Sequence, residues 1–284
     1  MKIIIVSFFF LFTSISWGQA EPFQIYNSKG RKVSFKKMTR KLLKKEIILF
    51  GELHNDPMAH FLQLKFAKEL FKNGSLSIGA EMLESDNQKY LNNYLKGELT
   101  AEGFDSLARL WNNYESDYKP IVDFAKDNRI PFIATNIPRR YASAVYKGGF
   151  EALKDLSEEE KSYIATLPIP YDPTLPGYQK MLEMVDGHAG ENFPKAQAIK
   201  DATMAFFIYE HFKENNHHFL HLNGAYHSEN KEGIYWYLHQ LDLRLHIGTI
   251  TTVIQEDINE LEEEHKGLAD FIIVVDKDVP RNGG

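Results

Sequence analysis

The sequence has 284 residues, of which 43% are hydrophobic and 13% aromatic, enough for one large domain with a substantial core. Its 33 Lys and Arg against 39 Asp and Glu give a formal net charge of −6, which argues against nucleic acid as a partner because phosphate binding needs a basic surface. The absence of cysteine excludes disulfides, thiolate metal ligands, a thiol nucleophile and a lipidated cysteine within this sequence. Small molecules or ions are the better candidate ligands.

The first residues have the pattern of an export signal. Lys2 precedes an apolar run over residues 3–12, and a polar segment of small residues follows over 14–20. We expect residues 1–18 to be a cleaved signal peptide, which predicts a periplasmic or secreted protein that is not lipidated. The apolar run is shorter than the roughly 20 residues of a spanning helix, so no stable membrane insertion is expected. An uncleaved anchor is the alternative.

After the signal, residues 19–45 are expected to form an N-terminal extension that ends in a basic helix over 36–45. Strands and helices then alternate. Strands are expected at residues 47–50, 75–80, 130–134, 217–222, 245–253 and 271–275, and helices after Asp56, at 88–95, at 120–128, after Pro138, at 195–214 and at 234–240. This alternation predicts a single α/β domain over residues 46–276, with a mostly parallel central sheet covered by helices on both faces, and a tail over 277–284.

One segment departs from the alternation. Residues 167–177 contain four prolines, and Tyr171 and Tyr178 lie in or just after the segment. This composition predicts a loop or lid.

Polar side chains stand at the ends of four of the expected strands. Because the carboxyl ends of parallel strands meet at one edge of a sheet, we expect residues at these ends to lie close together. The residues concerned are Glu52 and His54, Glu81, Asn136 with Arg139, and His227. Their convergence predicts one polar pocket at this edge of the sheet.

The residue types in this pocket suit metal-assisted hydrolysis. Glu52, His54 and His227 offer carboxylate and imidazole ligands for Zn, Mn, Co or Fe, and a divalent metal would activate bound water. Glu52 or Glu81 would then serve as the base. Arg139 would stabilise developing negative charge, or else form an ordinary ion pair at a helix start.

The long helix over 195–214 adds Gln197 and Asp201 on one face, since they are four residues apart. Asp201 interrupts an apolar neighbourhood and is expected either to face the pocket or to face solvent. His188 would approach from the loop over 186–190. The remaining histidines of the strands are expected to be packed or edge-exposed.

At these residues the chain resembles the ChaN family of haem-binding, iron-regulated proteins within the Tiki and erythromycin-esterase-like superfamily. The matching strings run in the family's order over roughly residues 46–253. They are Leu49-Phe50-Gly51-Glu52-Leu53-His54-Asn55-Asp56-Pro57, Gly79-Ala80-Glu81-Met82, Ala134-Thr135-Asn136-Ile137-Pro138-Arg139, Lys200-Asp201-Ala202-Thr203-Met204-Ala205 and Gly224-Ala225-Tyr226-His227.

The resemblance implies haem as the cofactor, a role in haem or iron acquisition, and haem held at least partly through tyrosine, between two subunits of a homodimer. Tyr171, Tyr178, Tyr226 and His188 are the candidate haem-binding residues. The superfamily also implies an alternative, because its proteases and esterases use residues at the places of Glu52, His54, Glu81 and His227 for hydrolysis. Two hypotheses therefore stand: an exported haem-binding protein, and a metal-dependent esterase or peptidase.

Overall fold

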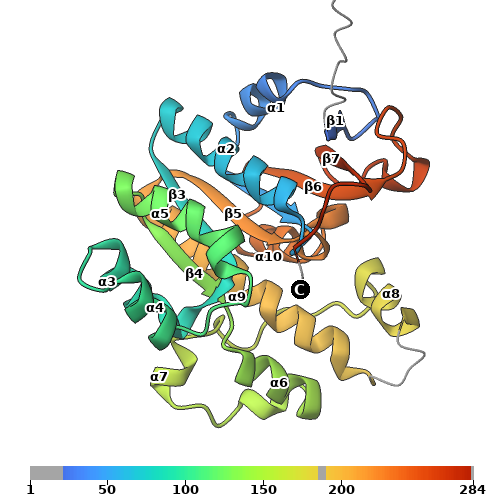
Figure 1. Ribbon diagram of the computed structural model, residues 1–284. Coiled ribbons are helices and arrows are strands. Elements are labelled where there is room, and N and C mark those ends of the chain that lie inside the picture. The colour runs from blue at the N-terminus through green and yellow to red at the C-terminus, as the bar shows by residue number, and fades with distance from the viewer. Residues whose placement is uncertain (1–21, 185–189, 283–284) are drawn as a thin grey trace, which may run out of the picture.

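The computed structural model describes residues 22–184 and 190–282 (Figure 1). The predicted signal peptide and His188 lie outside these residues. Along the described helices, none has the length and apolar character needed to cross a bilayer.

The core of the fold is a seven-stranded sheet with the order β1-β7-β6-β2-β5-β3-β4. Its strands are β1 (Phe23–Asn27), β2 (Ile47–Glu52), β3 (Leu76–Glu84), β4 (Phe132–Asn136), β5 (His218–Gly224), β6 (Ile247–Gln255) and β7 (Phe271–Asp276). All neighbouring strands are parallel except β1, which pairs antiparallel with β7 at one edge. The predicted single-domain α/β fold with a mostly parallel sheet is confirmed.

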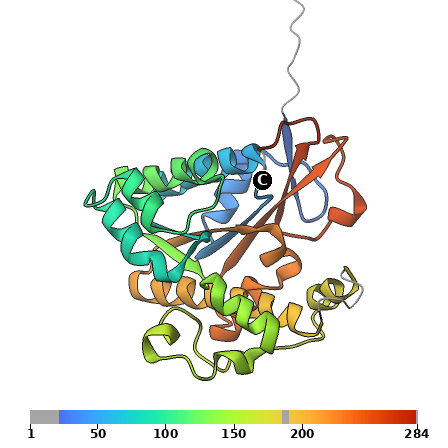
Figure 2. The same ribbon diagram turned by 60° about the horizontal axis from the view of Figure 1, so that its bottom comes forward.

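Helices cover both faces of the sheet, as predicted (Figures 1 and 2). The helices are α1 (Phe35–Leu42), α2 (Pro57–Asn73), α3 (Gln88–Leu95), α4 (Ala101–Leu107), α5 (Lys119–Asn128), α6 (Arg139–Gly148), α7 (Glu158–Lys161), α8 (Pro176–Met184), α9 (Asn192–Asn215) and α10 (Ile234–Leu241). Alternation along β2 explains the two layers: Ile48 and Phe50 pack with α1 to α5, whereas Ile47 and Leu49 pack with α8 to α10.

Four elements differ from the sequence prediction. The short helices α4, α7 and α8 were not predicted, and α8 begins at Pro176, inside the segment expected to be a loop or lid. β3 continues through a register shift to Glu84, so Glu81 lies within this strand rather than after it. The strand end was predicted too early because hydrophobic periodicity is the only sequence signal there, and a carboxylate interrupts it.

The segment expected as an extension is built into the domain. β1 extends the sheet, and Met38 and Leu42 of α1 are buried in the main core. Ser34 caps α1, since its side chain accepts a hydrogen bond from the Lys37 N–H at 3.3 Å. The described fold therefore begins at β1.

Candidate functional site

The end of β2 is followed at once by a helix start, which fixes the loop carrying His54. The Asp56 carboxylate caps α2 by accepting a hydrogen bond from the Ala59 N–H at 2.9 Å, and Pro57 occupies the first helical turn. Only three residues separate the last residue of β2 from this cap. The short connection holds His54 over the carboxyl edge of the sheet.

Strand register brings Glu52, Glu81 and Gly224 to the same edge. Glu52 pairs with Gly224 across β2 and β5, and Ala80, just before Glu81, pairs with Leu222 across β3 and β5. The Gly224 N–H donates to Glu81 Oε2 at 2.7 Å. A Cβ at Gly224 would come within 2.8 Å of His54 Nε2, so only glycine permits this approach.

Glu52 is a buried carboxylate that orients His54. Its Oε1 accepts hydrogen bonds from His54 Nδ1 at 2.9 Å and from the Tyr118 hydroxyl at 2.6 Å, and its Oε2 accepts from Gln63 Nε2 at 2.5 Å. With both oxygens occupied, Glu52 is placed to hold the His54 proton on Nδ1. The other ring nitrogen, Nε2, is left facing Gly224.

The ionisation of His54 responds to these neighbours. Burial lowers the pKa of His54, but the hydrogen bond to Glu52 and the charge of Glu81 together raise it above the ordinary histidine value. His54 therefore holds its proton more tightly than an ordinary histidine does.

A second acid and histidine group lies on the other side of Glu81. His227 contacts Asp201 through Nδ1 at 2.5 Å and Glu81 through Nε2 at 3.1 Å, and all three side chains are buried. Burial lowers the pKa of His227, but the two carboxylates outweigh it and raise this pKa to about 10. His227 is thus an imidazolium that donates one proton to each carboxylate.

The two carboxylates respond in opposite directions. Burial raises the pKa of Glu81, yet His227 and His54 together bring it well below its usual range. For Asp201, burial prevails over the attraction of His227 and raises the pKa. Glu81 is accordingly the main anionic partner of His227, with Asp201 as its second acceptor.

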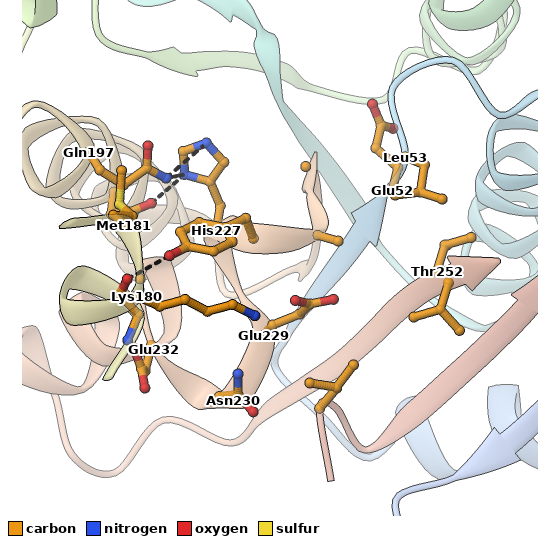
Figure 3. A pocket seen from close by; sticks show the side chains of 18 of the residues that line it. Glu52, Leu53, Lys180, Met181, Gln197, His227, Glu229, Asn230, Glu232 and Thr252 are labelled. Atoms are coloured by element: carbon orange, nitrogen blue, oxygen red, sulfur yellow. Dashed lines mark hydrogen bonds and ion pairs between the residues drawn. The ribbon is translucent and has the colours of Figure 1, made fainter. Parts of the chain in front are cut away.

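Both groups lie at one end of a large cavity of about 1120 Å³. The wall opposite the sheet comes from α8, which contributes Tyr178, Lys180 and Met181. Figure 3 shows the Lys180 side chain extending toward Glu229, and Gln197 beside the His227 ring. Buried charged groups therefore line one part of the cavity, and the wall formed by α8 is partly aromatic.

The helix α8 is attached to the body of the protein through Gly177. The Gly177 N–H donates to Glu232 Oε2 at 2.7 Å, and the Gly177 carbonyl accepts from the Tyr226 hydroxyl at 2.6 Å. A Cβ at Gly177 would lie 2.5 Å from Glu232 Oε2. The glycine therefore lets the α8 wall dock.

Replacing Gly177 with alanine is expected to loosen this docking. Alanine is the better helix former by about 1 kcal/mol, so the substitution should stabilise the helix itself. Faster hydrogen exchange would therefore report undocking of α8. Hydrogen exchange of the α8 amides should accelerate by about tenfold, as expected for local opening. Glu183→Ala, an exposed change on α8, is the control, and unchanged exchange in Gly177→Ala would contradict the role given to this glycine.

The structure brings most of the predicted site residues together. Glu52, His54, Gln197, Asp201 and His227 line the cavity, and Glu81 contacts His227 from β3. Asn136 stands behind Glu81, whose backbone carbonyl accepts from Asn136 Nδ2 at 2.9 Å. Arg139 is exposed at the first position of α6, outside the set of residues that line the cavity.

The predicted metal ligands are not arranged as one coordination set. His227 has both ring nitrogens engaged by carboxylates, and His54 Nδ1 is engaged by Glu52. Within residues 22–184 and 190–282, the group of three carboxylate and imidazole residues whose ligand atoms all lie within 4.8 Å of one another is instead Glu262, Glu264 and His265.

The three candidate tyrosines have different surroundings. Tyr178 lines the cavity and is 4% exposed, and its hydroxyl, next to that of Tyr237, makes no hydrogen bond among the described residues. Tyr226 also lines the cavity and is 38% exposed. Tyr171 does not line it, but packs on the Tyr178 ring with centroids 5.5 Å apart.

Sequence reasoning missed several residues of the site. Gln63 had a usable signal, because His60 and Gln63 interrupt the apolar face of α2 at a spacing of three. Tyr118 had none, since it comes from an irregular helical turn (Tyr114–Tyr118) far along the chain. Lys180 lies on the unpredicted helix α8.

The fold is a mostly parallel α/β sheet with a cavity at its carboxyl edge, lined by acids and histidines. This arrangement is typical of α/β proteins that bind small ligands. The family model for haem-binding uptake proteins of the Tiki superfamily, ChaN, matches residues 38–238, and the chain belongs to this family.

Solved structures share the fold. ChaN of Campylobacter jejuni, whose structure reports cofacial haem binding, superposes with a TM-score of 0.66 at 19% identity, covering 92% of this chain and 97% of that one. A Bacillus cereus protein gives 0.53 at 11% identity, covering 89% and 94%.

A curated relative matches part of the chain. Protein RETICULATA-RELATED 5, chloroplastic, from Arabidopsis thaliana is 27% identical over 134 residues, which is 44% of this chain and 18% of that protein. The match thus spans less than a fifth of the relative.

Proposed function

We propose that this protein is an exported haem-binding protein of iron acquisition, and that the cavity beneath α8 is its haem site. Family membership supports haem as the ligand class. The location of the haem site is supported by Tyr178, a buried phenol at the cavity wall whose hydroxyl makes no hydrogen bond among the described residues.

The residues of the cavity fit this ligand. Haem supplies a ferric centre, for which a tyrosine oxygen is a known axial ligand. Tyr178 would hold the iron, Met181 and Phe193 would contact the porphyrin ring, and Lys180 would pair with a propionate. Burial, with a further contribution from the charge of Asp201, raises the pKa of Tyr178 far above the ordinary range, so its proton stays on oxygen until a cation compensates the phenolate.

A hemin titration followed by absorbance tests this proposal. At micromolar protein, the wild type should give a saturable Soret shift, and Tyr178→Phe should bind about tenfold or more weakly because its oxygen ligand is gone, a loss of at least about 1.4 kcal/mol. Tyr171→Phe, which changes a tyrosine outside the cavity lining, is the matched control. Absence of a saturable shift in the wild type would refute haem binding, and an unchanged Tyr178→Phe would refute the assigned ligand.

Export is part of the same proposal. The charged start and apolar run before residue 14 support it. Mass spectrometry of the N-terminus after expression with the signal sequence should find a chain that starts near residue 19, in the extracytoplasmic fraction. A full-length chain in the cytoplasm would contradict export.

We include a homodimer in the proposal, because the mouth of the cavity carries exposed apolar groups. Tyr226 and Ile254 both line the cavity and are 38% and 37% exposed. A second copy would cover them. Analytical ultracentrifugation with and without hemin tests this, and a monomer under both conditions would rule it out.

The acid and histidine groups favour a second candidate, hydrolysis of an ester or amide. The observation behind it is His54, which lines the cavity and whose Nδ1 is held by Glu52 while its Nε2 faces Gly224. His54 would take a proton from an attacking water. The predicted metal ligands are not arranged to share one ion, so this candidate assigns the proton transfer to His54.

A broad hydrolase screen with the wild type and His54→Ala decides this candidate, with elemental analysis of the same preparation. Activity that falls by about 100-fold or more in His54→Ala would support it, as expected for loss of a general base. Activity equal in the two proteins, or none in either, would end it.

A further inference from the structure

The segment that follows β7, residues 277–282, runs back across the protein to the loop that carries His54. Figure 1 shows this dark red segment reaching the N-terminal end of α2. The Lys277 N–H donates to the Gln255 carbonyl at 3.0 Å, and Val279 packs against the main core. The segment is therefore held along its length.

Its last described residues make two hydrogen bonds beside the site. The Asn282 N–H donates to the Asn55 carbonyl at 3.0 Å, and Asn282 Nδ2 donates to Asp117 Oδ1 at 2.5 Å. Arg281 Nε lies 4.0 Å from Oδ2 of the fully buried Asp56, the oxygen of that carboxylate that the helix cap leaves free. Both residues next to His54 on its C-terminal side are thus contacted by the segment.

Asp117 connects Asn282 to the backbone of His54. Its Oδ2 accepts from Asn113 Nδ2 at 2.8 Å and lies 3.6 Å from His60 Nε2. The carbonyl of His54 in turn accepts from Asn113 Nδ2 at 2.8 Å and contacts His60 Nε2 at 3.1 Å. Asn282 therefore completes a partly buried network whose other end is the peptide of His54.

We propose that Asn282, with Arg281, is a positioning element of the cavity, which sets where the His54 imidazole lies relative to Glu52 and Gly224. The inference rests on the proposed site but not on which ligand the site takes. The family model ends at residue 238, so this device is not contained in the matched region. Nor do the two residues line the cavity, which means that they act only through the loop they hold.

The test compares imidazole resonances of His54 and His227 at a fixed neutral pH, without ligand. In Asn282→Asp, a carboxylate replaces the donor that faces Asp117, so the network should open. The His54 resonance should shift and amides of residues 53–56 should exchange about tenfold faster. The His227 resonance should stay in place, because Asp201 and Glu81 hold it on the other side of the site. Asp278→Ala, exposed in the same segment, should change neither.

If Asn282→Asp does not fold, Asn282→Ala tests the same point, because it removes the side-chain hydrogen bond without adding charge. A His54 resonance that coincides in variant and wild type would overturn the proposal. So would equal shifts of His54 and His227, because they would indicate a general loss of stability. A protein that fails to bind hemin would refute the proposed function alone, since this readout uses no ligand.

Discussion

Replacing His227 with glutamine is expected to lower the free energy of unfolding by about 3 to 5 kcal/mol. His227 is the buried cation between two buried carboxylates, Glu81 and Asp201. Its removal leaves two buried carboxylates without the cation they share, and breaking a buried ion pair on one side costs this much. Urea unfolding followed by circular dichroism measures the change.

A double-mutant cycle separates charge from packing. Glu81→Gln combined with His227→Gln should be less destabilised than the sum of the two single changes, because neither partner is then an isolated charge. His246→Gln is the matched control, since this histidine is exposed on the surface, and it should change stability by less than about 0.5 kcal/mol. A fully additive cycle would show that the pair is not coupled.

The stability of the wild type is expected to fall as pH rises from about 7 toward 10. The pKa of His227 is about 10 in the folded protein against an ordinary 6.5, so the folded state holds one more proton across this interval. Its stabilising contribution is complete below pH 6.5 and is lost as pH rises through 10, with a slope of about 1.4 kcal/mol per pH unit.

Unfolding measured at pH 7, 8 and 9 checks this slope while most tyrosines and lysines remain protonated. In His227→Gln the curve should be flatter over the same range. A wild-type stability that stays constant or rises between pH 7 and 9 would mean that His227 is not a buried cation.

Much of the fold followed from sequence because its signals are local. The apolar runs before Gly51 and Asn223 predicted two strands, and the turn chemistry of Asp56-Pro57 predicted where α2 begins. Shared strand polarity then brought Glu52, Glu81 and His227 to one edge. These inferences need only hydrophobic periodicity and capping rules.

The partners of those residues could not be predicted in the same way. Tyr118 reaches Glu52 from 66 positions along the chain, and Asn282 reaches Asp117 across 165. No spacing rule connects such residues, because tertiary packing alone brings them together. The α8 wall was missed for another reason: its prolines predicted a loop, but Pro176 stands at the first position of a helix, where proline is tolerated.

The most direct test of the central claim, that haem binds beneath α8, is a hydrogen-exchange footprint of hemin on the full chain. We predict slower exchange in α8 and in residues 224–229 on hemin binding, because both line the cavity, with no change in α3 on the other face of the sheet. Hemin binding without protection of α8, or protection confined to other elements, would contradict this account.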